Sequence, residues 1–112
     1  MRVTYCEGYY VPLPENHPFP MGKFPALYRI LLAEGLIEPG DVVEPAMATW
    51  EQLLLVHTPD YLTKLREGTL DRKEERKMGL PWSAGLVTRS RTAVGGTIIA
   101  ARMPPIQVPE LD

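Results

Sequence analysis

The chain has 112 residues, a net charge of −2, and 45% hydrophobic and 23% charged residues, which indicates one small globular domain and excludes a disordered chain. The charge gives no support for a nucleic-acid or anionic-membrane surface, and no apolar run approaches the roughly 20 residues that span a bilayer. Cys6 is the single cysteine, which excludes an internal disulfide; with no visible signal peptide, we expect a cytoplasmic protein.

The first half of the chain predicts the start of a parallel β–α–β unit. Residues 2–6 and 41–44 are short and β-prone. Between them lies a proline-rich loop at 11–25, followed by a 3.6-residue apolar pattern that ends at Gly35, where we expect a left-handed cap. Pro25 suits the first turn of this helix. A loop of this length inside a compact domain is uncommon and often functional.

The second half contains several helix-start signals. Thr49 begins a capping box with Gln52, and Thr58 precedes proline and aspartate as a second cap. We expect a short helix through 53–55 after the first cap. Residues 71–77 alternate in charge and predict a solvated turn or short helix. Ser83 then caps the longest predicted helix.

That long helix carries Gly95 and Gly96 in its middle. No lysine follows them as in a phosphate-binding loop, and the Gly-x-Gly-x-x-Gly spacing of dinucleotide sites is absent. Two interior glycines cost a helix roughly 2 kcal/mol relative to alanine, so close packing must offset them. Arg89 and Arg91 fall on opposite sides of the helix and form no single basic patch.

Few side chains suggest chemistry on their own. We expect His57 to be half-buried with a ring nitrogen bonded to the backbone, and His17 to be a turn residue of the proline-rich loop. A zinc site built from His17, His57 and Asp60 would need the fold to bring distant segments together. Cys6 has no cationic neighbour in sequence, so we expect its thiol to be buried and inert. Trp82 is either a core staple or a rim residue of a pocket.

Three stretches together resemble the N-terminal part of the histone deacetylase superfamily. They are LPENHPFPMGKFPALYRILLAEGL, ATWEQLLLVHTPDYLTKLREGTL and MGLPWSAGLVTRSRTAVGGTIIAAR. Their order and spacing are similar to those of bacterial acetoin-utilisation and acetylpolyamine deacetylase-like proteins over residues 2–102.

The resemblance implies an α/β fold: the N-terminal portion of a three-layer arginase/deacetylase architecture with a mainly parallel sheet, incomplete in this chain. On this basis we expect residues 1–103 to be part of that domain and residues 104–112 to form a proline-rich irregular tail. The family chemistry is zinc-dependent hydrolysis of an acetylated amine. As candidates for the substrate-channel rim it suggests His17, Lys23, Pro81 and Trp82. Lys23 stands where many members have an arginine, which keeps the charge without the planar donor fork.

The residues that would bind zinc and perform catalysis in the family lie beyond the matched stretch. No Gly-Gly-x-His-His or Asp-x-His motif follows, so we expect no cofactor, metal ligand or catalytic residue in this chain. We expect a truncation or frameshift product, or a reading frame whose limits are incompletely defined.

Two alternatives stay open beside an inactive deacetylase segment. One is a small binding or regulatory module that associates with a partner, and the other is a small enzyme that uses His17, His57 and Asp60. A sheet of about two strands leaves apolar helix faces without the further strands that would cover them. We therefore expect self-association or binding to a partner, or else an aggregating or molten chain. We also expect the loops 17–23 and 78–82 to lie near each other.

Overall fold

The computed structural model describes residues 1–104. Its elements are β1 (Val3–Thr4), η1 (Glu7–Tyr9), α1 (Lys23–Ala33), η2 (Pro39–Asp41), β2 (Val42–Val43), α2 (Trp50–Leu53), α3 (Pro59–Glu67), α4 (Arg72–Met78) and α5 (Ala84–Arg102). The two strands pair in parallel, with Val3 opposite Val42, and α1 connects them. The predicted parallel β–α–β start is confirmed. Both strands are shorter than predicted, because only two residues of each find a ladder partner.

Helix α1 ends in the predicted left-handed cap. Gly35 has a φ of +70°, which favours glycine. The Gly35 N–H donates to the Leu32 carbonyl oxygen at 3.2 Å and the Leu36 N–H to that of Leu31 at 3.0 Å, the hydrogen-bond pattern of a Schellman motif. Pro25 lies in the first turn of α1, as its fixed φ predicts.

The other helix starts also follow the sequence. The hydroxyl oxygens of Thr49, Thr58 and Ser83 accept hydrogen bonds from the first turns of α2, α3 and α5, and Asp71 caps α4 in the same way. Helix α2 ends at Leu53, so the predicted helix through 55 is too long by two residues. Within the described residues, no helix is long and apolar enough to cross a membrane.

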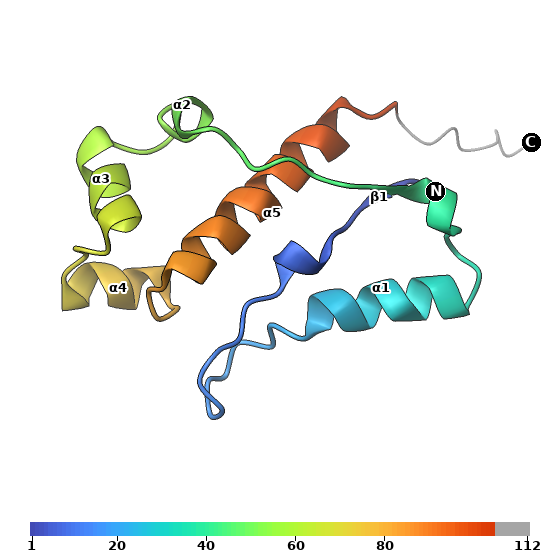
Figure 1. Cartoon of the computed structure of the whole chain (residues 1–112), viewed down its shortest axis with the longest axis horizontal. Coiled ribbons are helices and arrows are strands. Elements are labelled where there is room, and N and C mark those ends of the chain that lie inside the picture. Colours follow the sequence, from blue (N-terminus) through green and yellow to red (C-terminus); the bar gives the residue numbers. More distant parts are fainter. Residues whose placement is uncertain (105–112) are drawn as a thin grey trace, which may run out of the picture.

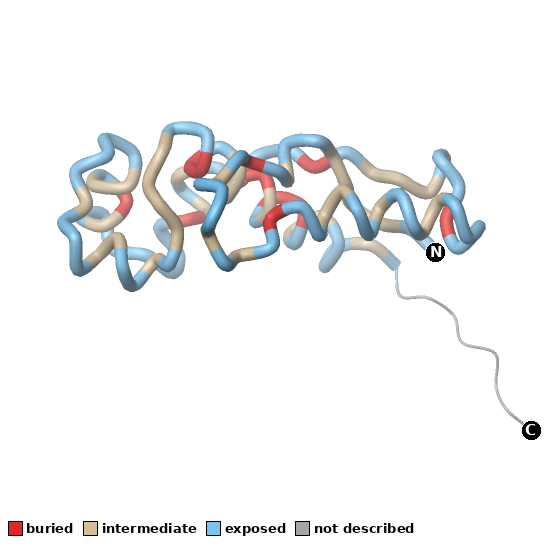
Figure 2. Tube along the Cα trace, turned by 90° about the horizontal axis from the view of Figure 1, so that it is seen from below, coloured by how far each residue is buried: buried red, intermediate tan, exposed pale blue. Residues whose placement is uncertain are grey.

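Two small clusters form most of the core, and Ile37 and Val87 are buried outside them. One is formed by Val11, Met21 and Leu86, the other by Ala48, Leu53 and Leu62. Helix α5 contacts β1, η1 and α3, and α1 lies on the opposite side of β1 (Figure 1). The Cα radius of gyration is 16.7 Å, above the roughly 13 Å of a compact domain of this length. Figure 2 shows the result: buried positions are scattered along a thin slab that is mostly exposed.

The glycine pair of α5 is a packing surface, as predicted. Gly95 and Gly96 are both buried. A Cβ on Gly95 would overlap the Ala46 carbonyl oxygen, and one on Gly96 would overlap the Tyr9 hydroxyl. The absence of these two side chains therefore lets segments from two other parts of the chain lie directly on the helix.

Candidate functional site

The loop after η1, helix α4 and the segment after α4 border an open surface cavity of about 610 Å³. The cavity is lined by Pro14, His17, Arg72, Glu75, Arg76, Gly79, Leu80 and Pro81. The loops also share an apolar cluster, in which Phe19 from one and Leu80 from the other pack around Leu86. The prediction that loops 17–23 and 78–82 lie near each other is therefore confirmed.

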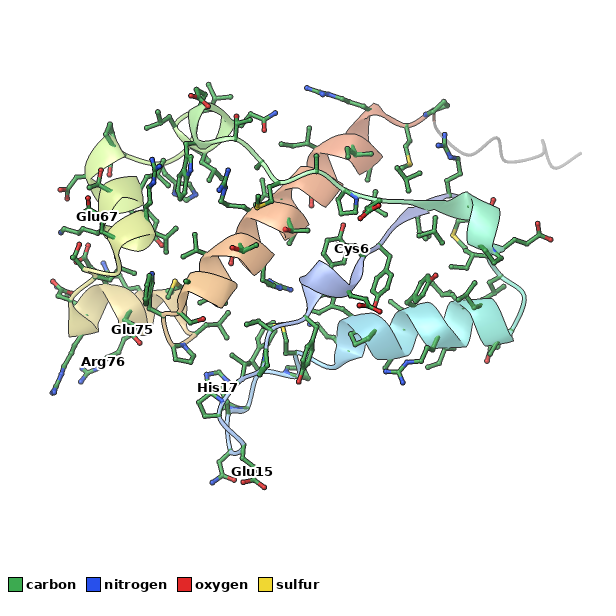
Figure 3. All side chains as sticks on the ribbon, in the orientation of Figure 1. Cys6, Glu15, His17, Glu67, Glu75 and Arg76 are labelled. Carbon is green, nitrogen blue, oxygen red and sulfur yellow. The ribbon has the colours of Figure 1, made fainter. Side chains whose placement is uncertain are left out.

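His17 lies in a tight turn of the proline-rich loop. Its Nδ1 accepts a hydrogen bond from the Phe19 N–H at 3.1 Å, so the ring holds the loop in shape, as a turn residue does. Figure 3 shows Glu15 at the loop tip, with His17 closer to α4. The turn therefore presents His17, and not the acidic tip, to the cavity.

Lys23 lies at the first position of α1 and outside the wall of this cavity. Its ammonium lies 5.1 Å from the Phe19 ring centroid and 5.2 Å from that of Phe24. Both distances are within the range of a cation–π contact. Lys23 therefore joins the loop to α1.

Pro81 and Trp82 are neighbours with different roles. Pro81 lines the cavity. The Trp82 indole N–H donates to the Leu65 carbonyl oxygen at 2.7 Å, and the ring covers Gly68, where a Cβ would approach within 2.7 Å. Of the two alternatives for Trp82, the structure therefore supports a packing staple, which binds the end of α3 to the start of α5.

Helix α4 forms the other wall and is held from two sides. The Glu75 Oε1 accepts the Trp82 N–H at 3.1 Å. The Lys64 ammonium lies 3.3 Å from the Glu74 carboxylate, and this hydrogen bond raises the pKa of Lys64. At the helix start, the hydrogen bond from the Glu74 N–H lowers the pKa of Asp71. These contacts fix the orientation of α4 toward the loop.

Arg89 and Arg91 lie on opposite sides of α5, as predicted, and each anchors a different segment. The Arg89 Nε donates to the Tyr9 carbonyl oxygen at 3.0 Å, and the Arg91 Nε to that of Ala48 at 3.0 Å. Each guanidinium also lies over an aromatic ring, and burial lowers the pKa of Arg89. Both arginines therefore act in packing.

The residues considered for a small enzyme are not assembled. His57 is exposed, so the expectation of a half-buried ring is wrong. The ring is exposed because α2 ends early and leaves the following turn uncovered. It lies beside Tyr61, with ring centroids 5.4 Å apart. Cys6 is half-buried instead of buried. Within residues 1–104, no three His, Cys, Asp or Glu side chains come together in a group that could hold a metal ion. His17, His57 and Asp60 thus form no zinc site.

Three charged wall residues could not be recognised from the sequence: Arg72, Glu75 and Arg76. Their alternating signs indicated only a solvated segment. The available signal was the capping box at Asp71, which fixes where α4 starts and therefore which of its side chains share a face.

Comparison with known proteins supports the resemblance seen in the sequence. A sequence model of the histone deacetylase domain matches residues 17–104. An uncharacterised protein of Picosynechococcus is 50% identical over 101 residues, which cover 90% of this chain and 34% of that protein. The acetoin utilization protein AcuC of Bacillus subtilis is 34% identical over 95 residues, 78% of this chain and 24% of its own length.

Histone deacetylase 2 of Arabidopsis thaliana is 30% identical over 112 residues, which cover 92% of this chain and 29% of that protein. The chain therefore spans between about a quarter and a third of the length of these relatives. The match of the histone deacetylase domain over residues 17–104, most of the chain, places this protein in the histone deacetylase family.

Proposed function

We propose that residues 1–103 are the N-terminal part of a three-layer α/β deacetylase domain whose activity is zinc-dependent hydrolysis of an acetylated amine, either acetyl-lysine or an acetylpolyamine. The observation that carries this proposal is the domain match over 17–104. The names of two relatives, an acetoin utilization protein and a histone deacetylase, agree with it. The two-stranded parallel sheet is compatible with a part of such a domain.

Within that domain, this segment would supply part of the rim of the substrate channel. The support is the meeting of the loop that carries His17 with the segment that carries Pro81 around one cavity. Lys23 contacts the first loop through its cation–π contact with Phe19, and Trp82 joins the second loop to α3 by its hydrogen bond to Leu65. Their contribution is to position the rim.

We further propose that this chain does not turn over substrate by itself. Bound zinc would polarise an acetyl carbonyl and activate a water molecule. It requires three protein ligands at about 2 Å with one open position, and the side chains of residues 1–104 do not fit that requirement. A zinc titration by calorimetry should therefore show no tight stoichiometric binding, and turnover that His57→Ala abolishes would contradict the proposal.

A chimaera tests the deacetylase assignment directly. The matched 101 residues of the Picosynechococcus relative would be replaced by those of this chain, since 50% identity favours a compatible interface. We expect the chimaera to bind zinc, measured by mass spectrometry, and to hydrolyse an acetylated amine, with the intact relative assayed in parallel as the control. If the intact relative hydrolyses an acetylated amine and a folded, zinc-loaded chimaera does not, the result counts against the assignment.

The alternative of a small module that binds a partner has one specific support. Leu55 and Val56, in the turn after α2, are 84% and 78% exposed. Two large apolar side chains in contact with water favour association with another surface. We propose self-association or partner binding through this turn, which sedimentation of the purified chain would detect.

A further inference from the structure

The cavity between the loop and α4 has a positive wall. Its charged lining side chains are Arg72, Arg76 and Glu75, all from α4, so the wall carries two positive charges and one negative charge. In Figure 3, Arg76 and Glu75 project from α4 on the side where the loop with His17 lies.

The carboxylate of the wall is already engaged. The Glu75 Oε1 accepts the backbone N–H of Trp82 at 3.1 Å. Within residues 1–104, both ion pairs are made by Lys64, which binds Asp60 and Glu74. No described carboxylate forms an ion pair with Arg72 or Arg76, although Glu75 keeps its charge in the same wall. Both guanidinium groups therefore keep donors for a ligand.

His17 adds a further donor from the opposite wall. Its Nδ1 is the acceptor of the Phe19 N–H, so the neutral ring carries its proton on Nε2. The second nitrogen of His17 is thus a hydrogen-bond donor in a half-buried ring that lines the cavity. Donors from two separate segments therefore border one space.

The charge around this wall differs from that of the whole chain. The net charge of the protein is −2, whereas the segment 72–77 contains four basic and two acidic residues, a net +2. Such a local field attracts anions and repels polycations. The paired geometry of guanidinium groups also suits carboxylate and phosphate oxygens.

We propose that this cavity binds a carboxylate or phosphate group that the substrate carries beside its acylated amine. This inference rests on the proposed deacetylase function. The anion site would determine which acetylated substrates the deacetylase prefers. A peptide with an acetyl-lysine next to acidic or phosphorylated residues fits the wall, whereas an acetylpolyamine, with its remaining cationic amines, does not. Arg72, Arg76 and His17 are the residues that determine this specificity.

Binding to the ¹⁵N-labelled full chain tests the inference without zinc or turnover. Three acetyl-lysine peptides, flanked by glutamate, phosphoserine or glutamine, would be titrated beside an acetylated polyamine. We expect both anionic peptides to shift the amide signals of Gly79, Leu80 and the His17 loop. They should bind about three- to tenfold more tightly than the glutamine peptide. The glutamate and phosphoserine arms show which anion the cavity prefers.

Matched variants show whether the cavity wall or only the overall charge of the protein causes the tighter binding of anionic peptides. Arg72→Gln and Arg76→Gln should remove most of the preference for anionic peptides, while Lys73→Gln, on the same helix but outside the cavity wall, should keep it. An equal loss in Lys73→Gln would overturn the inference, as would equal binding of the glutamine peptide or preference for the polyamine. Signals at unfolded positions would also contradict it, because the cavity would not exist in this protein.

The chimaera separates this inference from the deacetylase assignment. Turnover of acetylated peptides with no preference for acidic flanks would reject the anion site and leave the assignment intact. Zinc loading without any turnover would reject the assignment, while the binding titration still decides on the anion site.

Discussion

The middle of α5, which has small residues, and the turn after α2, which has large apolar ones, have opposite surroundings. Thr92, Gly95 and Gly96 are buried by segments from elsewhere in the chain. Leu55 and Val56 are more than three-quarters exposed. Small residues allow backbones to approach and create their own contacts, whereas large apolar residues need a surface that residues 1–104 do not provide. Apolar content alone thus does not show which part of this chain is core.

The contacts around the glycines explain why a helix with two interior glycines persists. The Ala48 N–H donates to the Arg91 carbonyl oxygen at 2.9 Å, and the Arg91 Nε returns a hydrogen bond to Ala48. These bonds require the segment 46–48 to lie on the helix surface, where a side chain at Gly95 would stand in its way. They offset the roughly 2 kcal/mol that two glycines cost a helix.

The largest expected effect is at the tightest contact. Gly95→Ala places a Cβ against the backbone oxygen of Ala46, which cannot rotate away, and we expect a loss of about 2–3 kcal/mol in the free energy of unfolding. Chemical denaturation would measure it. Gly40→Ala is the control, because no atom lies within 4 Å of its Cβ, and it should change stability little. Equal effects at both positions would show that the close packing is unimportant.

Trp82→Phe should have an intermediate effect. It removes the indole donor to the Leu65 carbonyl oxygen, a bond of 2.7 Å, together with the outer ring atoms that lie over Gly68. We expect about 1–2 kcal/mol less stability, since a half-buried acceptor loses its partner. A parallel Trp50→Phe variant distinguishes this bond from a general loss of indole area. If both variants melt alike, Trp82 is not the staple described above.

Replacement of the exposed turn should change association and leave stability almost unaltered. The double variant Leu55→Ser and Val56→Ser removes apolar area that the fold does not bury. We expect stability within about 0.5 kcal/mol of the parent chain and a lower sedimentation coefficient at high concentration. Leu53→Ser, at a buried position, should instead destabilise the chain. Unchanged self-association in the double variant would reject the turn as the interface.

The smallest effect concerns the start of α4. The Glu74 N–H lowers the pKa of Asp71, so the stability from its charged form is present above the unfolded-state pKa of about 3.9. It is lost as pH falls through the lower folded-state pKa. We expect α4 amide signals to report fraying in that acidic range. Asp71→Asn keeps a capping side chain that does not titrate, and the fraying should then be absent. If the variant frays at the same pH, another group is responsible.

The helix starts, the caps and the parallel start of the fold were predictable because each depends on neighbours in sequence. Thr49, Thr58 and Ser83 bond to N–H groups three residues ahead, and Gly35 supplies a positive φ whatever surrounds it. The family could likewise be read from the order and spacing of motifs. His17 and Pro81 were identified as rim candidates in the same way.

The tertiary structure alone decided which surfaces meet. The sequence could not show that Arg72 and Arg76 face the loop with His17, that Trp82 bonds Leu65, or that His57 is exposed. Local signals act over three or four residues, whereas the contact between Trp82 and Leu65 joins residues 17 positions apart and that between Arg89 and Tyr9 joins residues 80 apart. Such pairings depend on how whole elements pack, and an arginine has the same pattern in sequence whether or not a distant loop packs beside it.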